Sequence, residues 1–293
     1  MKVYEFLEGA IDLHIHAVPD LFERPLDEVD IALQGRDVGY RAILFKSHYT
    51  TNADRMYVNR KIVKGIEIFG SLILNQSVGG INPEAVHAAI RLGAKAVYMP
   101  TIHSKRHLEV HGRPSYPWSG IKVQPVEPIS ILTEEGEVIP QLYEVLDILA
   151  VNDVILGTGH LSRDEIMIVV GEAKKAGVEK IVVTHADIDT TALTPEDQNK
   201  LAGMGAYIEH CFTPCMPLRQ RLDPRRIAEA IKLVGAERCV MSTDFGQMQN
   251  PLPVEGMRMF VQHMLKCGLS MDEIDVMIKD NPAKLLGLEL GTP

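Results

Sequence analysis

The stretch Ile11-Asp-Leu-His-Ile-His16 decides the fold, because it joins an apolar strand pattern to two histidines on one face. Side chains at positions i and i+2 of a strand point to the same side, so His14 and His16 can both face a barrel interior. Seven more apolar runs follow the run over 11–17, at 42–48, 70–75, 96–101, 154–160, 181–186, 206–211 and 239–245. Most are apolar throughout, which is typical of parallel strands that are covered on both faces.

The segments between these runs carry the sequence signals of helices. Three begin with an N-cap residue followed by proline, at Asn82-Pro83, Thr194-Pro195 and Asp223-Pro224. Two more have capping-box spacing, at Ser162 with Glu165 and at Ser270 with Glu273. The runs recur at intervals of roughly 30 residues, as βα units require. We therefore predict a (β/α)8 TIM-type barrel, and the absence of any linker predicts a single domain over residues 1–293.

The interval between the fourth and fifth runs contains an insertion over about residues 102–140. Within it, residues 129–139 are predicted to form a small hairpin that turns at Glu135-Gly136. At the mouth of a barrel the insertion could serve as a specificity lid or as padding, and the sequence leaves both open. His103, His107 and His111 form an H-x3-H-x3-H pattern, but the nearby Gly112 favours an irregular, solvated loop over a second metal site.

The composition excludes several classes of function. The 293 residues carry a net charge of −9 and no Lys/Arg-rich run, so nucleic acid is not an expected partner. No apolar stretch approaches the roughly 20 residues of a membrane span, and the first ten residues lack the apolar segment of a secretory signal. The four cysteines lie in or beside apolar segments, which favours reduced thiols in a cytoplasmic protein.

Potential metal ligands end four of the predicted strands. His14 and His16 end the first, and His160, His185 and Asp244 end the fifth, sixth and eighth. Barrel enzymes keep their active sites at the carboxyl ends of the strands, so these five side chains should converge. Four imidazoles and one carboxylate suit a divalent transition metal, with Zn²⁺ favoured and Mn²⁺, Fe²⁺ or Ni²⁺ as alternatives.

This set resembles the amidohydrolase superfamily of metal-dependent hydrolases, over the whole chain. The residues that carry the resemblance are His14, His16, His160, His185 and the Ser242-Thr-Asp244 motif, with the closing segment 279–288. The chain is similar to the compact branch of barrels without a β-sandwich domain, and within it to a subgroup with no assigned activity. The branch includes amide and lactone hydrolases as well as decarboxylases and hydratases.

The resemblance implies a role for each residue. His14, His16 and Asp244 would hold a first metal, while His160 and His185 would hold a second or divide between the metal and the substrate. Asp244 would be the general acid and base, and His185 is the second candidate catalytic residue. We expect hydrolysis of an amide, cyclic amide or lactone in a small, anionic molecule by a metal-activated water. A metal-dependent decarboxylase or hydratase is the alternative.

The sequence departs from the superfamily at the fourth strand, which has no lysine or glutamate to bridge two metals. Lys46, near the end of the second strand, is the nearest candidate for a bridge if its amine is carbamylated. The alternatives are a lysine that binds an anionic substrate or pairs with a carboxylate. One metal ion or two are therefore both open.

Other strand-end residues are weaker candidates for contact with a substrate. They are His48, Asn75 and Arg163, and either Glu209 or His210 must face the barrel. A non-catalytic barrel would require an incomplete ligand set, which this sequence does not have. Homo-oligomers are common among such barrels, so we expect a homo-oligomer whose copy number the sequence does not determine.

Overall fold

The centre of the computed structural model, which describes residues 4–114 and 124–289, is a sheet of eight parallel strands in the order β1 to β8. The strands are β1 (Ile11–His16), β2 (Ala42–Lys46), β3 (Glu67–Ile73), β4 (Ala94–Tyr98), β5 (Ile155–Gly157), β6 (Ile181–Val183), β7 (Tyr207–Cys211) and β8 (Cys239–Ser242). A parallel bridge between Ile15 and Phe245 joins the end of β8 to β1. The predicted (β/α)8 barrel is therefore confirmed.

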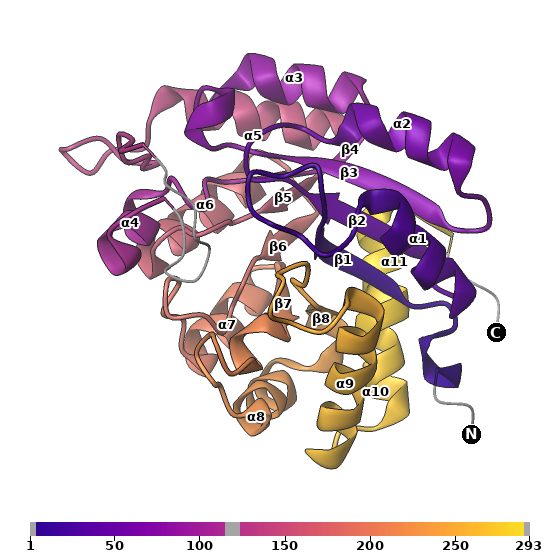
Figure 1. The fold of residues 1–293 in the computed structure, drawn as a ribbon. Helices are drawn as coiled ribbons and strands as arrows, with labels where there is room; N and C mark the ends of the chain where they lie inside the picture. Colours follow the sequence, from indigo (N-terminus) through magenta and orange to yellow (C-terminus); the bar gives the residue numbers. More distant parts are fainter. Residues whose placement is uncertain (1–3, 115–123, 290–293) are drawn as a thin grey trace.

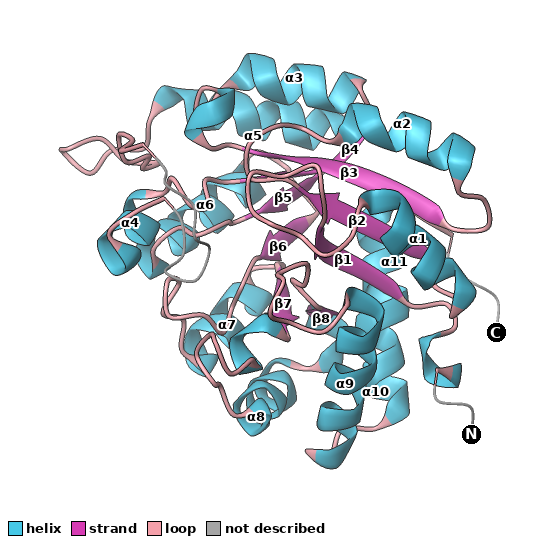
Figure 2. Cartoon of the chain, in the orientation of Figure 1, coloured by secondary structure: helices cyan, strands magenta, loops and turns pink. Residues whose placement is uncertain are grey.

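Helices surround the strands, as Figures 1 and 2 show. Those that follow β1 to β8 are α1 (Glu28–Asp37), α2 (Ala53–Ile62), α3 (Pro83–Arg91), α5 (Pro140–Asn152), α6 (Arg163–Lys175), α7 (Pro195–Gly203), α8 (Pro224–Val234) and α9 (Pro253–Lys266). The last segment contains α10 (Met271–Asp275), a π-helical turn (Val276–Asp280) and α11 (Asn281–Leu286). None of the described helices is long and apolar enough to cross a lipid bilayer.

The predicted helix starts are confirmed in detail. The side chains of Asn82, Thr194 and Asp223 each accept hydrogen bonds from backbone amides of the first turn of α3, α7 and α8. Both predicted capping boxes form, at Ser162 on α6 and at Ser270 on α10.

The apolar core has two layers. Strand residues that point inward, such as Leu44 and Val240, form an inner cluster with Ala283, Leu285 and Leu286 of α11. The outer and larger layer lies between the strands and the surrounding helices. Since α11 packs into the inner cluster, it closes the base of the barrel and leaves the opposite end for a site.

The insertion between β4 and α5 is more ordered than predicted. Leu132 and Val138 form an antiparallel bridge around a turn at Thr133–Gly136, so the small hairpin is confirmed. The irregular loop expected around His107 is wrong, because α4 (Lys105–His111) forms there. Ser104 caps its start, and Gly112, with φ of 70°, ends it. The glycine that indicated a loop is therefore a helix stop.

Candidate metal centre

His14 and His16 both reach the barrel interior through an irregularity in β1. The pairing of β1 with β2 changes register between Asp12 and Ile15. Leu13 belongs to the inner apolar cluster, whereas Ile15 belongs to the outer one. A bulge of this kind re-aims side chains, and such irregularities are common next to active sites.

Asp244 lies directly against the two histidines. Its Oδ1 is 3.2 Å from Nε2 of His14 and 3.3 Å from Nε2 of His16. The closure of the barrel places it there, because the Asp244 amide donates to the His14 carbonyl at 2.9 Å. Asp12 strengthens the contact between β1 and the segment after β8, because its carboxylate accepts a hydrogen bond from the Thr243 hydroxyl at 2.6 Å. Burial raises the pKa of Asp12 to about 7.

His185 and His160 complete the cluster from just beyond β6 and β5. The ring centroid of His185 lies 4.6 Å from the ring centroid of His14 and 4.9 Å from that of His160. His185 and Asp244 have φ values of 55° and 53°, in the left-handed region that non-glycine residues rarely occupy. Strained backbone of this kind concentrates at functional sites, where the surroundings hold it in place.

Every strand except β7 ends one to three residues earlier than the sequence predicted. The structure ends β5, β6 and β8 two or three residues before His160, His185 and Asp244, which therefore lie at the start of the following loops. All five predicted ligands, including His14 and His16 of β1, are buried.

The electrostatics of the cluster favour metal-binding protonation states. Burial lowers the pKa of His16, His160 and His185 well below the ordinary value, so these rings are neutral at neutral pH. Burial also raises the pKa of Asp244, but His14, His185 and Arg219 outweigh it and hold that pKa below its usual value. Neutral imidazoles beside a carboxylate are the form that binds a cation.

The donor set fits a metal ion on geometry as well. Nε2 of His14 and Nδ1 of His185 are buried and have no hydrogen-bond partner among residues 4–114 and 124–289. Buried polar atoms without a partner are rare, and each requires an explanation. Ligand atoms of His14, His16 and Asp244 lie within 4.8 Å of one another, so a single cation could contact all three.

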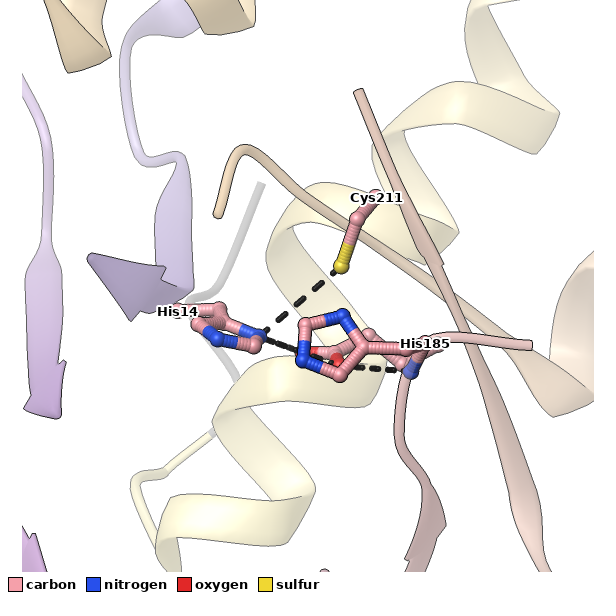
Figure 3. Close-up of side chains that lie close together, drawn as sticks. His14, His185 and Cys211 are labelled. Carbon is pink, nitrogen blue, oxygen red and sulfur yellow. Dashed lines mark hydrogen bonds and ion pairs between the residues drawn. The ribbon is translucent and has the colours of Figure 1, made fainter. Parts of the chain in front are cut away.

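Of the two candidates on β7, Glu209 and not His210 faces the barrel. Both of its carboxylate oxygens lie 3.2 Å from Nδ1 of His14, which must donate to them. This donation leaves Nε2 of His14 as the lone-pair atom on the Asp244 side. Cys211 also approaches the ring, with Sγ 3.8 Å from the same nitrogen, and Figure 3 shows His14, Cys211 and His185 converging.

A model for a family of unknown function, DUF6282, matches residues 9–209. The chain belongs to this family. No curated protein matches the sequence.

Solved structures share the fold of this DUF6282 protein at low sequence identity. An amidohydrolase of Pseudomonas aeruginosa has 13% identity and a TM-score of 0.66, with 99% of this chain and 98% of that chain covered. The phosphotriesterase homology protein of Escherichia coli has 15% identity and a TM-score of 0.57, covering 95% and 98%. A 2,6-dihydroxybenzoate decarboxylase of Rhizobium has 11% identity and a TM-score of 0.57, covering 96% and 99%. At the level of the fold, the predicted resemblance to amidohydrolase barrels is confirmed.

Lys46 of the DUF6282 protein is buried beside the cluster without a hydrogen-bond partner. Its Nζ lies 3.9 Å from the centroid of the Tyr98 ring, at the end of β4. Burial lowers the Lys46 pKa, and Glu209, Asp244 and Cys211 partly oppose the shift. The lysine therefore lies at the metal centre, and its carbamylation stays a prediction.

The three predicted substrate residues lie in three different environments. His48 stacks on His16 at 4.7 Å between ring centroids and lines the pocket over the cluster. Asn75 is buried away from the pocket, where it donates to the His48 carbonyl and to Thr101 Oγ1, both at 2.9 Å. Arg163 is half-exposed, forms an ion pair with Asp197 and does not line the pocket.

Sequence reasoning missed part of the pocket wall. The pocket over the cluster is lined by His16, Phe22, Arg24, His48, His160, His185, Arg219, Asp244 and Gln247. The missed residues lie in loops several positions beyond β1, β7 and β8, whereas the sequence analysis considered residues adjacent to strand ends. Their place in the loops after barrel strands was the available indication.

Proposed function

We propose that this DUF6282 protein is a metal-dependent hydrolase of the amidohydrolase type. It would cleave an amide, cyclic amide or lactone bond in a small, anionic molecule. The observation that carries the proposal is that five buried candidate ligands from four strand ends converge, and that ring nitrogens of His14 and His185 among them have no hydrogen-bond partner in the described part of the chain. Structures of the same fold include both an amidohydrolase and a decarboxylase, so the fold alone does not choose the reaction.

The ligand residues divide between two positions. His14, His16 and Asp244 would hold a first metal, while His160 and His185 would hold a second one or join the first. Nitrogen-rich sites with one carboxylate favour Zn²⁺ over Mg²⁺ or Ca²⁺. A metal bound there supplies a Lewis acid and lowers the pKa of a coordinated water.

Asp244 supplies the proton transfer in this proposal. Its low pKa keeps it a carboxylate at neutral pH, ready to accept a proton from the attacking water. The same carboxyl can then deliver that proton to the leaving nitrogen or oxygen. His185, whose Nδ1 lies 3.8 Å from Asp244 Oδ2, is placed to contact the reacting group.

Replacement of Asp244 by asparagine tests this role. Asp244→Asn keeps the size and one oxygen but removes the base, so we expect turnover to fall by about 10²–10⁴-fold. Turnover of a lactone and amide substrate panel would be measured beside metal content by elemental analysis. Unchanged turnover in a metal-loaded variant would contradict the assigned role.

The pocket wall favours a substrate with a negative charge. Arg24 and Arg219 both line it. Arg24 is held by Asp20 at 2.7 Å, so its charge is partly neutralised. The charge of Arg219 acts on both His185 and Asp244, the two proposed catalytic residues. The charge of Arg24 acts instead on His16 and His48.

A pair of arginine variants tests the anion preference. We expect Arg219→Ala to weaken calorimetric binding of inorganic phosphate to the zinc-loaded protein by about tenfold, because a charge-assisted contact is lost. Arg163→Ala is the matched control, since Arg163 lies outside the pocket, and it should bind phosphate like the wild type. Equal losses in both variants, or none in either, would count against the Arg219 assignment.

A decarboxylase or hydratase is the second candidate, favoured by one specific observation. β4 ends at Tyr98 and offers no bridging carboxylate, and a carbamylated Lys46 is the bridge that the sequence predicts in its place. A site without a bridge from β4 or Lys46 holds one metal more readily than two, although the Glu209 carboxylate also lies among the possible ligands. One tightly held metal per chain would favour the lyase, whereas two would favour the hydrolase and the Lys46 bridge.

A further inference from the structure

The inserted helix α4 places a further histidine ring, His107, beside the candidate metal cluster of four histidines. His107, in the middle of α4, is fully buried beside His160. The two rings stack at 23° with centroids 5.1 Å apart, and their Nδ1 atoms lie 3.1 Å from each other. The proposed function gives His107 no role.

One hydroxyl fastens the helix to His160 through the backbone. Ser104 Oγ donates to the His160 carbonyl at 2.7 Å and accepts from the His107 amide at 3.0 Å. The amide of Lys105 in turn donates to the Ile129 carbonyl at 2.7 Å, which ties the start of α4 to the rest of the insertion. Several hydrogen bonds therefore fix the position of the His107 ring relative to His160.

The contact between the two Nδ1 atoms has a chemical consequence. Two neutral imidazoles can share a hydrogen bond there only if one nitrogen carries a proton and the other offers a lone pair. Because His160 uses Nδ1 for this contact, Nε2 is its remaining ring nitrogen toward the pocket that the residue lines. The direction of the hydrogen bond thus decides whether Nε2 offers a lone pair or a proton to the site.

We propose that His107 is a positioning residue: its Nδ1 accepts the Nδ1–H of His160 and so makes Nε2 of His160 a metal ligand. The proposal rests on the metal centre of the proposed function. His14 has the equivalent arrangement on the other side of the site, where its Nδ1 donates to Glu209. Outer partners of this kind fix the tautomer and orientation of ligating histidines, and their loss weakens metal binding by about 10–100-fold.

Two substitutions at His107 distinguish the effect of losing its hydrogen bond from the effect of losing its side-chain volume. Asparagine carries a carbonyl oxygen at the δ1 position, so His107→Asn keeps an acceptor for His160, whereas His107→Leu removes it at similar size. We expect His107→Leu to lower Zn²⁺ affinity by about 10–100-fold in competition with a chromophoric chelator. His107→Asn should bind Zn²⁺ close to the wild-type affinity, and His87→Leu, on the exposed face of α3, is the control. Equal losses in the asparagine and leucine variants, or no loss in leucine, would overturn the proposal.

Ring ¹⁵N NMR of the metal-free wild type tests the tautomers directly and does not depend on metal binding. We expect His160 to be protonated at Nδ1 and His107 at Nε2, with assignments from the signals lost in His107→Asn and His160→Gln. A His160 protonated at Nε2 would overturn the inference. Failure of the wild type to bind Zn²⁺ would refute the proposed metal centre instead, and the two failures are therefore distinguishable.

Discussion

Glu209 and His210 are consecutive residues of β7 that point to opposite sides of the barrel wall. Glu209 receives the Nδ1–H of His14 inside, whereas His210 Nδ1 lies 2.8 Å from Asp187 Oδ2 outside. Burial lowers the pKa of His210, but the Asp187 carboxylate outweighs it and raises that pKa to about 10. The ion pair therefore stabilises the fold through a histidine that is charged at neutral pH.

This ion pair predicts a pH dependence of stability. The folded pKa of about 10 exceeds the unfolded value of 6.5, so the stabilisation is complete below pH 6.5 and is lost as pH rises through 10. Asp187→Asn should lower the free energy of unfolding by about 3 kcal/mol at pH 6 and by progressively less toward pH 10. Urea unfolding of both proteins across this range measures the difference. A gap that widens with pH would contradict the predicted sign.

At the scale of the element, the two predicted capping boxes differ in the contacts that their glutamates make. Glu165 of α6 accepts from Ser162 and also from the Ser130 hydroxyl of the insertion at 2.8 Å. Glu273 of α10 makes only the local box with Ser270. Glu165 is buried and Glu273 only partly buried, and the Glu165 box joins two parts of the chain whereas the Glu273 box starts a helix.

We therefore expect Glu165→Ala to cost more than Glu273→Ala. Loss of the Glu273 box should lower the free energy of unfolding by about 1 kcal/mol. Glu165→Ala should cost about 2–4 kcal/mol, because it also leaves buried donors of the insertion without an acceptor. Denaturant melts of the two variants give the comparison, and equal costs would mean that Glu165 does not anchor the insertion.

At the scale of the whole molecule, the metal site joins four strand ends that lie far apart in sequence. A cation that contacts all of them binds only the assembled barrel, so it stabilises the folded state. At a free concentration of 100 times its dissociation constant, Zn²⁺ should add about 2.7 kcal/mol. Unfolding midpoints with Zn²⁺ and with chelator measure this gain, and a His14→Ala/His16→Ala variant should show none. An equal gain in the variant would place the bound metal elsewhere.

The sequence by itself determined the barrel and the candidate ligand residues. Parallel strands covered on both faces must be apolar, so the polar residues His14, His160 and Asp244 stood out where the apolar runs ended. Proline and capping residues act within one turn of chain, and the predicted helix starts at Asn82, Thr194 and Asp223 formed for that reason.

Only the tertiary structure decided which side chains meet. Three features each depend on residues far away in sequence. They are the bulge in β1, the inward orientation of the Glu209 side chain and the salt bridge that holds Arg163 outside the pocket. His107 shows the physical reason most clearly. Its local sequence, close to a glycine, indicated a solvated loop, but burial against His160 requires contacts across more than fifty residues that no local pattern encodes.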